Sequence, residues 1–140
     1  MFSPTLNNLQ LQQLSEGLAA LDGISTKPGE FEPFVFDPDT TWDIAGNQTL
    51  VTDKLRVFER ARKLLAAQHK IVNQMPVTPE NAESVDLFVQ GLDELQNREV
   101  VLDGIKNLSR AKLNVGPDAK KGQNRIPPSA LAKLAPILEP

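Results

Sequence analysis

The nine residues MPVTPENAE, from Met75 to Glu83, constrain the fold of this chain more than any other segment. Pro76 has no N–H group and disfavours helical backbone in the preceding residue, so a helix arriving from the N-terminal side ends near Met75. Thr78 is a good N-cap for a second helix whose first residue is Pro79. So short a link places consecutive helices side by side and antiparallel. The sequence therefore predicts a central helical hairpin.

The first arm of this hairpin is predicted at about residues 52–74. Leu55, Phe58, Leu65 and Val72 recur at helical spacing and form one apolar stripe. Basic side chains gather on another face of the same helix, which makes the helix amphipathic. These bases are Arg56, Arg60, Lys63 and Lys70.

The second arm is predicted at about residues 79–114, with two alternatives for its course. An apolar rhythm of seven residues runs through it, but polar residues interrupt this rhythm after Leu95, and a second stripe takes over. The helix therefore either changes its packing partner near Asn97 or breaks there. Gly91 and Gly104 each weaken a helix or allow another helix to approach closely. The first rhythm comprises Val85, Phe88, Leu92, Leu95, Leu102 and Leu113, and the second stripe Val101, Ile105 and Leu108.

Shorter elements are expected on both sides of the hairpin. An N-terminal helix is predicted from about Thr5 to Leu21, because four leucines recur there at spacings of three and four. Prolines and glycines exclude a helix from residues 24–49, so that segment is either a β-hairpin around Asp37-Pro38-Asp39-Thr40 or an extended arm. The last part, residues 116–140, reads as a linker followed by a Pro-rich arm.

These elements suit one mainly α-helical domain over residues 1–140. We divide it into an N-terminal helix with an extended arm at 1–49, a helical hairpin core at 50–115, and a linker with a docking tail at 116–140.

Composition excludes several kinds of chemistry. The chain has no cysteine, so disulfides, thiolate ligands and a cysteine nucleophile are excluded. Its single histidine, His69, has no partner that the sequence makes visible, and we expect neither a metal site nor a cofactor. No apolar run approaches the ~20 residues that cross a bilayer, and the first residues lack the features of a signal peptide. We therefore expect a soluble intracellular protein without membrane contacts.

The stretch FVFDPDTT, residues 34–41, resembles the first motif of haloacid-dehalogenase-type phosphotransferases. The resemblance implies that Asp37 is a nucleophile and Asp39 a general acid or base. That chemistry also needs Mg²⁺, a downstream lysine and an alternating α/β sheet. The predicted helices provide no such sheet. We therefore interpret Asp37 as a turn-forming residue in a protein that is not an enzyme.

Charge alternates along the chain in four blocks. The net charge is −7 over residues 1–53, +5 over 54–75, −6 over 76–104 and +5 over 105–140. Blocks of this size favour pairing within the chain or between copies of it. The alternative is a set of ordinary solvated faces, because exposed ion pairs contribute only ~0–1 kcal/mol each.

The features together predict a structural or adaptor protein that acts through protein–protein contacts. The expected partners are further copies of the chain and a larger assembly. By analogy with small helical proteins that carry extended arms, a virus particle is one such assembly. Aromatic and aliphatic residues are the candidate contacts, although the aromatic ones also suit a small satellite core. The candidates are Phe31, Phe34, Phe36, Trp42, Leu131, Leu134, Ile137 and Leu138.

The alternative function is that of a small helical regulator that binds nucleic acid. Its phosphate contacts would come from the basic face of the first arm and from a second basic group in the linker. These residues are Arg56, Arg60, Lys63 and Lys70, together with Lys120, Lys121 and Arg125.

Overall fold

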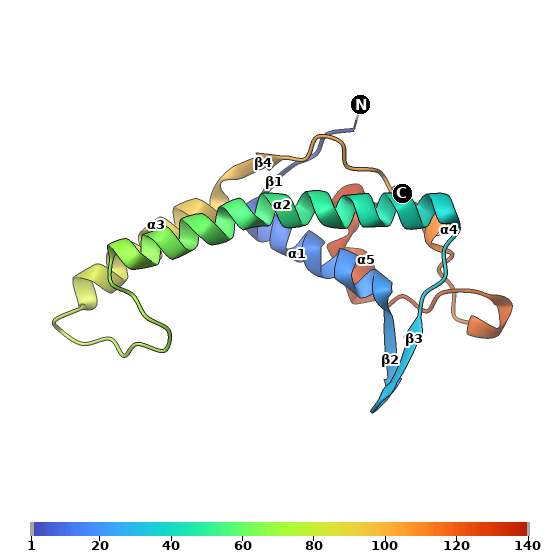
Figure 1. Cartoon of the computed structure of the whole chain (residues 1–140), viewed down its shortest axis with the longest axis horizontal. Coiled ribbons are helices and arrows are strands. Elements are labelled where there is room, and N and C mark those ends of the chain that lie inside the picture. Colours follow the sequence, from blue (N-terminus) through green and yellow to red (C-terminus); the bar gives the residue numbers. More distant parts are fainter. Residues whose placement is uncertain (1, 140) are drawn as a thin grey trace.

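A computed structural model describes residues 2–139 and shows a mainly α-helical chain organised along one long helix (Figure 1). This helix, α2, runs from Pro38 to Gln68, and α3 runs from Ala82 to Asn97. The two helices lie side by side at the C-terminal end of α2, and the loop that joins them forms the tip of an elongated molecule. The predicted helical class and the helical hairpin are therefore confirmed. The predicted ends of the two arms are wrong, because α2 ends at Gln68, before the left-handed Lys70, and not near Met75. Helix α3 starts at Ala82 after Asn81, and not at Pro79 with Thr78 as its cap.

The remaining elements are short and lie mostly beside the N-terminal half of α2 (Figure 1). In chain order they are β1 (Thr5–Asn7), α1 (Asn8–Ala19), the 3₁₀ helix η1 (Ala20–Asp22), β2 (Gly23–Lys27), β3 (Glu30–Pro33), β4 (Glu99–Val101), α4 (Arg110–Leu113), η2 (Ala119–Lys121), α5 (Pro128–Lys133) and η3 (Ala135–Ile137).

Two antiparallel strand pairs complete the topology. β1 pairs with β4, with Leu6 opposite Val100, and this ladder joins the start of the chain to the segment after α3. β2 pairs with β3 as a local hairpin, in which Ile24 lies opposite Glu32. This hairpin turns at Pro28-Gly29 and ends at Pro33, so the β-hairpin predicted around Asp37-Pro38-Asp39-Thr40 is wrong.

The hydrophobic core lies between α1, the N-terminal half of α2, α5 and the irregular segment that follows β4. Helix α1 buries Leu11, Leu14 and Leu18 on one face, as its leucine spacing predicts. The middle of the segment predicted as the helical hairpin core, 50–115, contributes little to this hydrophobic core. The most completely buried apolar side chains are Leu11, Leu14, Leu18, Val51, Leu102, Leu108, Leu113, Leu134 and Ile137.

Helix α2 begins at Pro38 rather than near residue 52. Asp37 is its N-cap and Pro38 occupies a position in the first turn where no N–H group is needed. The first half of α2 faces the core with Thr40, Ile44, Asn47 and Val51, of which two are polar. The apolar stripe of this half is therefore incomplete in the sequence. The exclusion of a helix from residues 24–49 is wrong from Pro38 onward, because Pro38 stands in the first turn and Gly46 is tolerated inside the helix.

The second arm breaks near Asn97, which decides between the two alternatives for its course. Arg98 has extended backbone, and the chain then enters β4. Gly104 has φ +88°, a left-handed conformation that an α-helix does not contain. Leu102 and Leu108 are buried in the core, but they lie on irregular backbone and not on a helix. The continuation of the predicted second arm beyond residue 97 as one helix is therefore wrong.

The first helix is displaced from its predicted start by a better cap. Asn7 and Gln10 form a reciprocal capping box, in which each side chain accepts a hydrogen bond from the other residue's N–H group, at 2.8 and 2.9 Å. The helix therefore starts at Asn8 rather than Thr5, and residues 5–7 are free to form β1.

The C-terminal segment packs against its own chain. Helix α5 lies along α1, and Leu131, Leu134 and Ile137 are buried there, while Leu138 packs partly against the same core. The leucine face of α1 is an apolar surface within reach, so covering it needs no second copy. The prediction of a tail whose apolar side chains await a partner is therefore wrong for this fold.

Among residues 2–139, no helix combines the length and the apolar character that crossing a membrane requires.

Candidate protein interface on the helical hairpin

Asp37 is a structural residue at the start of α2. Its Oδ1 atom accepts a hydrogen bond from the Thr40 N–H group at 2.7 Å. This backbone hydrogen bond, with further help from the Thr40 side chain, holds the pKa of Asp37 below its ordinary value. Asp37 therefore caps a helix and does not end a parallel strand as a phosphotransferase nucleophile would.

The lowered pKa of Asp37 predicts a component of stability that is lost in acid. Its charged form contributes stability above the unfolded-state pKa, near ~4, and this contribution is lost as the pH falls through the lower folded-state pKa. We expect Asp37→Asn to preserve much of the cap at pH 7 but to flatten the fall of Tm with acid, whereas Asp37→Ala lowers Tm at pH 7. Thermal melts from pH 7 to ~3 measure both effects; equal pH slopes for parent and Asn variant would contradict the assignment.

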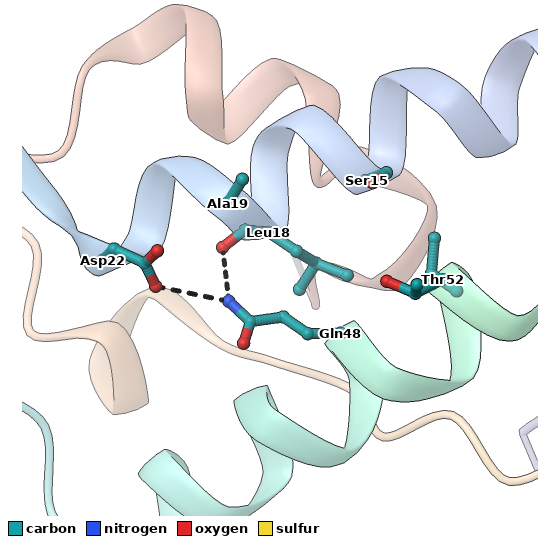
Figure 2. Close-up of a pocket in the computed structure, with 7 residues that line it drawn as sticks. Ser15, Leu18, Ala19, Asp22, Gln48 and Thr52 are labelled. Carbon is teal, nitrogen blue, oxygen red and sulfur yellow. Dashed lines mark hydrogen bonds between the residues drawn. The ribbon is translucent and has the colours of Figure 1, made fainter. Parts of the chain in front are cut away.

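A small cleft between α1 and α2, of about 210 Å³, is lined by Ser15, Leu18, Asp22, Gln48 and Thr52 (Figure 2). Gln48 crosses it and donates from Nε2 to the Leu18 carbonyl at 2.9 Å and to Asp22 at 3.5 Å. Leu18 lies in the last turn of α1, where carbonyl groups lack helical partners. The cleft is thus a place where α2 caps α1, and the hydrogen bonds across it join no hydroxyl nucleophile to a base.

His69 ends α2 as its C-cap and is half-buried. Across residues 2–139, the His, Asp and Glu side chains form no group of three that could hold a metal ion.

The four candidate aromatic contacts are divided between different surroundings. Phe34 and Phe36 pack partly against the main core. Phe31 is 61% exposed on β3, and Trp42 is 80% exposed on α2. The sequence cluster therefore leaves two exposed aromatic rings, each on a different element.

The two basic groups of the nucleic-acid alternative lie at opposite ends of α2. The segment that holds Lys120 and Lys121 is near the N-terminal end of α2, whereas residues 60–70 approach the hairpin tip (Figure 1). Arg56 is paired with Asp53 at 3.0 Å, and Arg125 with Glu32. The chain therefore does not join these bases into one continuous surface.

We define the hairpin arm as residues 54–97. Most of the apolar side chains of this arm are exposed or only partly buried. Helix α3 is 16 residues long and amphipathic, yet none of its side chains is buried. Within the whole arm only Phe58 is buried, at 4% exposure. The exposed large apolar residues of the arm are Val57, Leu64, Val72, Val77, Leu87 and Val89.

Apolar clefts lie on two sides of the arm. One, of about 560 Å³, is lined by Ala66 of α2, by Phe88 and Val89 of α3 and by Val77 of the tip loop, among others. The other, of about 580 Å³, is nearer the body and includes Val57, Ala61 and Leu95. Ala61 and Ala66 are five residues apart on α2 and so point about 140° away from each other. A layer of two helices therefore exposes apolar surface on both of its faces.

Close packing holds the two helices of this layer together. At Gly91 of α3, an added Cβ would lie 2.8 Å from a methyl carbon of Leu65 on α2. A larger residue here would have to displace the end of the Leu65 side chain, so glycine favours the close approach, which was one of the two interpretations of Gly91 in the sequence.

The edges of the arm carry opposite charges. Helix α3 has four exposed acids and no base, while Arg60 and Lys63 of α2 are exposed. Among residues 2–139, the four ion pairs include none that joins α2 to α3. The acids of α3 are Glu83, Asp86, Asp93 and Glu94.

Comparison of the chain with known protein families, curated proteins and solved structures found no match.

Sequence reasoning predicted the arm but placed its apolar residues in a core. Val72 was assigned to the buried stripe, yet it is 65% exposed and follows the end of α2. The amphipathic pattern reveals which side of a helix is apolar, but it contains no information on whether the chain itself supplies enough surface to cover that side.

Proposed function

We propose that this chain is a non-enzymatic structural or adaptor protein that acts through protein–protein contacts, with the hairpin arm as its interface. The observation that carries the proposal is that α3 buries none of its side chains in its own chain although one of its faces is apolar. Contiguous apolar surface of this kind is typical of interaction sites on water-soluble chains. The setting in a larger assembly, including a virus particle, remains a prediction by analogy.

The arrangement of the molecule supports this division of roles. The core lies beside the N-terminal half of α2 and holds that half in place through Ile44 and Val51. The same helix then continues beyond the core and carries the arm outward (Figure 1). A rigid continuous helix thus presents an apolar surface at a distance from the body, where a partner reaches it without contacting the core.

Site-specific photo-crosslinking tests the proposal. A photoreactive phenylalanine analogue replaces Val89 on the arm, which is 55% exposed, and in a matched control it replaces Val35 on the body, which is 69% exposed. The sample is irradiated in the cells or particles that contain the protein. We expect position 89 to give a covalent product with another polypeptide chain and position 35 to give much less of such a product.

A pair of polar substitutions provides the second readout. Val77→Thr and Val89→Gln are expected to change the stability of the isolated chain by less than ~0.5 kcal/mol each, because both side chains are largely exposed in it. A large fall in Tm would show that the arm packs within its own chain. That result, or an absence of crosslinks at position 89, would overturn the proposal.

A further inference from the structure

The hairpin arm is half of a familiar packing unit. Two antiparallel helices enclose no core between them, whereas four helices do, through apolar side chains that face a common axis. Here Phe88, Leu92 and Leu95 are only partly buried, and Val89 is more than half exposed. A second pair of helices laid on one face of the arm would complete such a bundle.

The charges of the arm specify which helix should lie beside which. An incoming helix next to α2 would lie near the exposed bases Arg60 and Lys63. One next to α3 would lie near Asp93 or Glu94, two exposed acids that point about 100° apart. The partner must therefore place an acidic helix beside α2 and a basic helix beside α3. The arm of a second copy has this composition, with α3 as the acidic helix and α2 as the basic one.

The contact between Leu65 and Gly91 fixes the levels of these charges along the arm. Because α2 and α3 are antiparallel, Lys63 and Asp93 lie at the same level, each two residues from that contact and on the side nearer the body. A copy related by a two-fold axis along the arm keeps this level, because both tips then point the same way. It also brings α2 of each copy beside α3 of the other.

We propose that the hairpin arm pairs with the arm of a second copy of this chain, forming a four-helix bundle in which α2 of each copy lies beside α3 of the other. The inference rests on the proposed function and names its partner. The pairing buries the open apolar face of α3 and places the unpaired bases of α2 next to the acids of α3.

A charge exchange tests the pairing directly. One variant carries Arg60→Glu and Lys63→Glu, and a second carries Asp93→Lys and Glu94→Lys. All four side chains are exposed and none takes part in an ion pair within residues 2–139, so each variant is expected to fold like the parent. Circular dichroism melts at low concentration check the folding.

Sedimentation velocity on the full chain then gives the outcome. We expect the parent to dimerise and each variant alone to dimerise at least tenfold more weakly, because like charges would face each other at both symmetry-related contacts. An equimolar mixture of the two variants is expected to regain the dimer, since each acidic edge again meets a basic one. A single chain with all four substitutions is expected to regain it as well.

Other results would overturn the inference in distinguishable ways. A parent chain that stays monomeric up to about 1 mM shows that the arm does not pair with itself. If the parent dimerises and each double variant dimerises as strongly as the parent, self-association uses another surface. If the parent is monomeric but position 89 crosslinks to a different protein, the self-pairing is wrong and the proposed function stands. If neither association is found, both fail.

Discussion

Removing residues 127–140 is expected to abolish the cooperative fold. The segment buries Leu131, Leu134 and Ile137 against α1 and the segment after β4. Burial of these three side chains stabilises the fold by about 5–9 kcal/mol in total. A domain of this size is stable by only about 5–15 kcal/mol, so the loss leaves little or no folded chain.

Backbone hydrogen bonds disappear with the same truncation. Leu108 donates from its N–H group to the Ile137 carbonyl at 2.8 Å, and Glu139 donates to the Leu108 carbonyl at 2.7 Å. The truncated chain would thus expose Leu108 as well as the leucine face of α1. We expect a broad, non-cooperative melt by circular dichroism in place of a single transition.

A milder variant guards against a trivial failure of expression. Leu134→Ala keeps the whole chain and is expected to cost about 2–5 kcal/mol, because Leu134 is fully buried. Lys133→Ala is the matched control, because its ion pair with Glu16 is exposed and contributes at most ~1 kcal/mol. A different result would mean that the tail joins separate copies: a truncated chain that melts cooperatively at the parental Tm but forms a smaller oligomer than the parent.

Asn124→Ala is expected to destabilise the fold by about 2–4 kcal/mol. The Asn124 amide makes two hydrogen bonds with the Val35 backbone, at 2.9 and 2.8 Å, and donates a third to the Leu113 carbonyl at 2.8 Å. Asn124 itself is buried at 5% exposure. Alanine would leave backbone groups of two distant segments without these partners, which costs more than a solvent-exposed hydrogen bond would.

Chemical denaturation of the Asn124→Ala variant measures this loss as a lower midpoint with an unchanged slope. Asn73→Ala is the control, because Asn73 is an exposed residue of the tip loop. If the two variants differ by less than ~0.5 kcal/mol, the asparagine is not holding the segment before α2 to the core.

Two further buried asparagines act in the same way as Asn124. Asn47 pairs with Lys106 through both backbone groups, at 2.9 and 2.8 Å, and Asn8 donates to the Leu95 carbonyl at 2.7 Å. Each side chain satisfies backbone groups of irregular chain or a helix end. No sequence pattern identified these residues, because asparagine is usually exposed and its partners are up to 89 residues away.

The candidate interface on the hairpin arm was likewise only partly predictable from the sequence. The helices, the acidic and basic blocks and the apolar face of α3 were all visible in the sequence. That the apolar face stays open follows from the placement of α5, which packs mainly against α1, whereas α3 meets α1 near its own C-terminal end, where Asn8 donates to the Leu95 carbonyl. Burial depends on which surfaces reach each other, and that is a property of the whole chain.

By itself, the sequence determined the features that depend on neighbouring residues. The leucine face of α1 and the helical hairpin around Pro76 and Pro79 rest on interactions within a few residues. The exclusion of cysteine chemistry rests on composition alone. Only the tertiary structure decided that Thr40 and Asn47 face the core, that the chain leaves the helix after Asn97, and that the C-terminal segment packs on α1. These outcomes depend on contacts between distant segments, whose free energy of burial outweighs local preference.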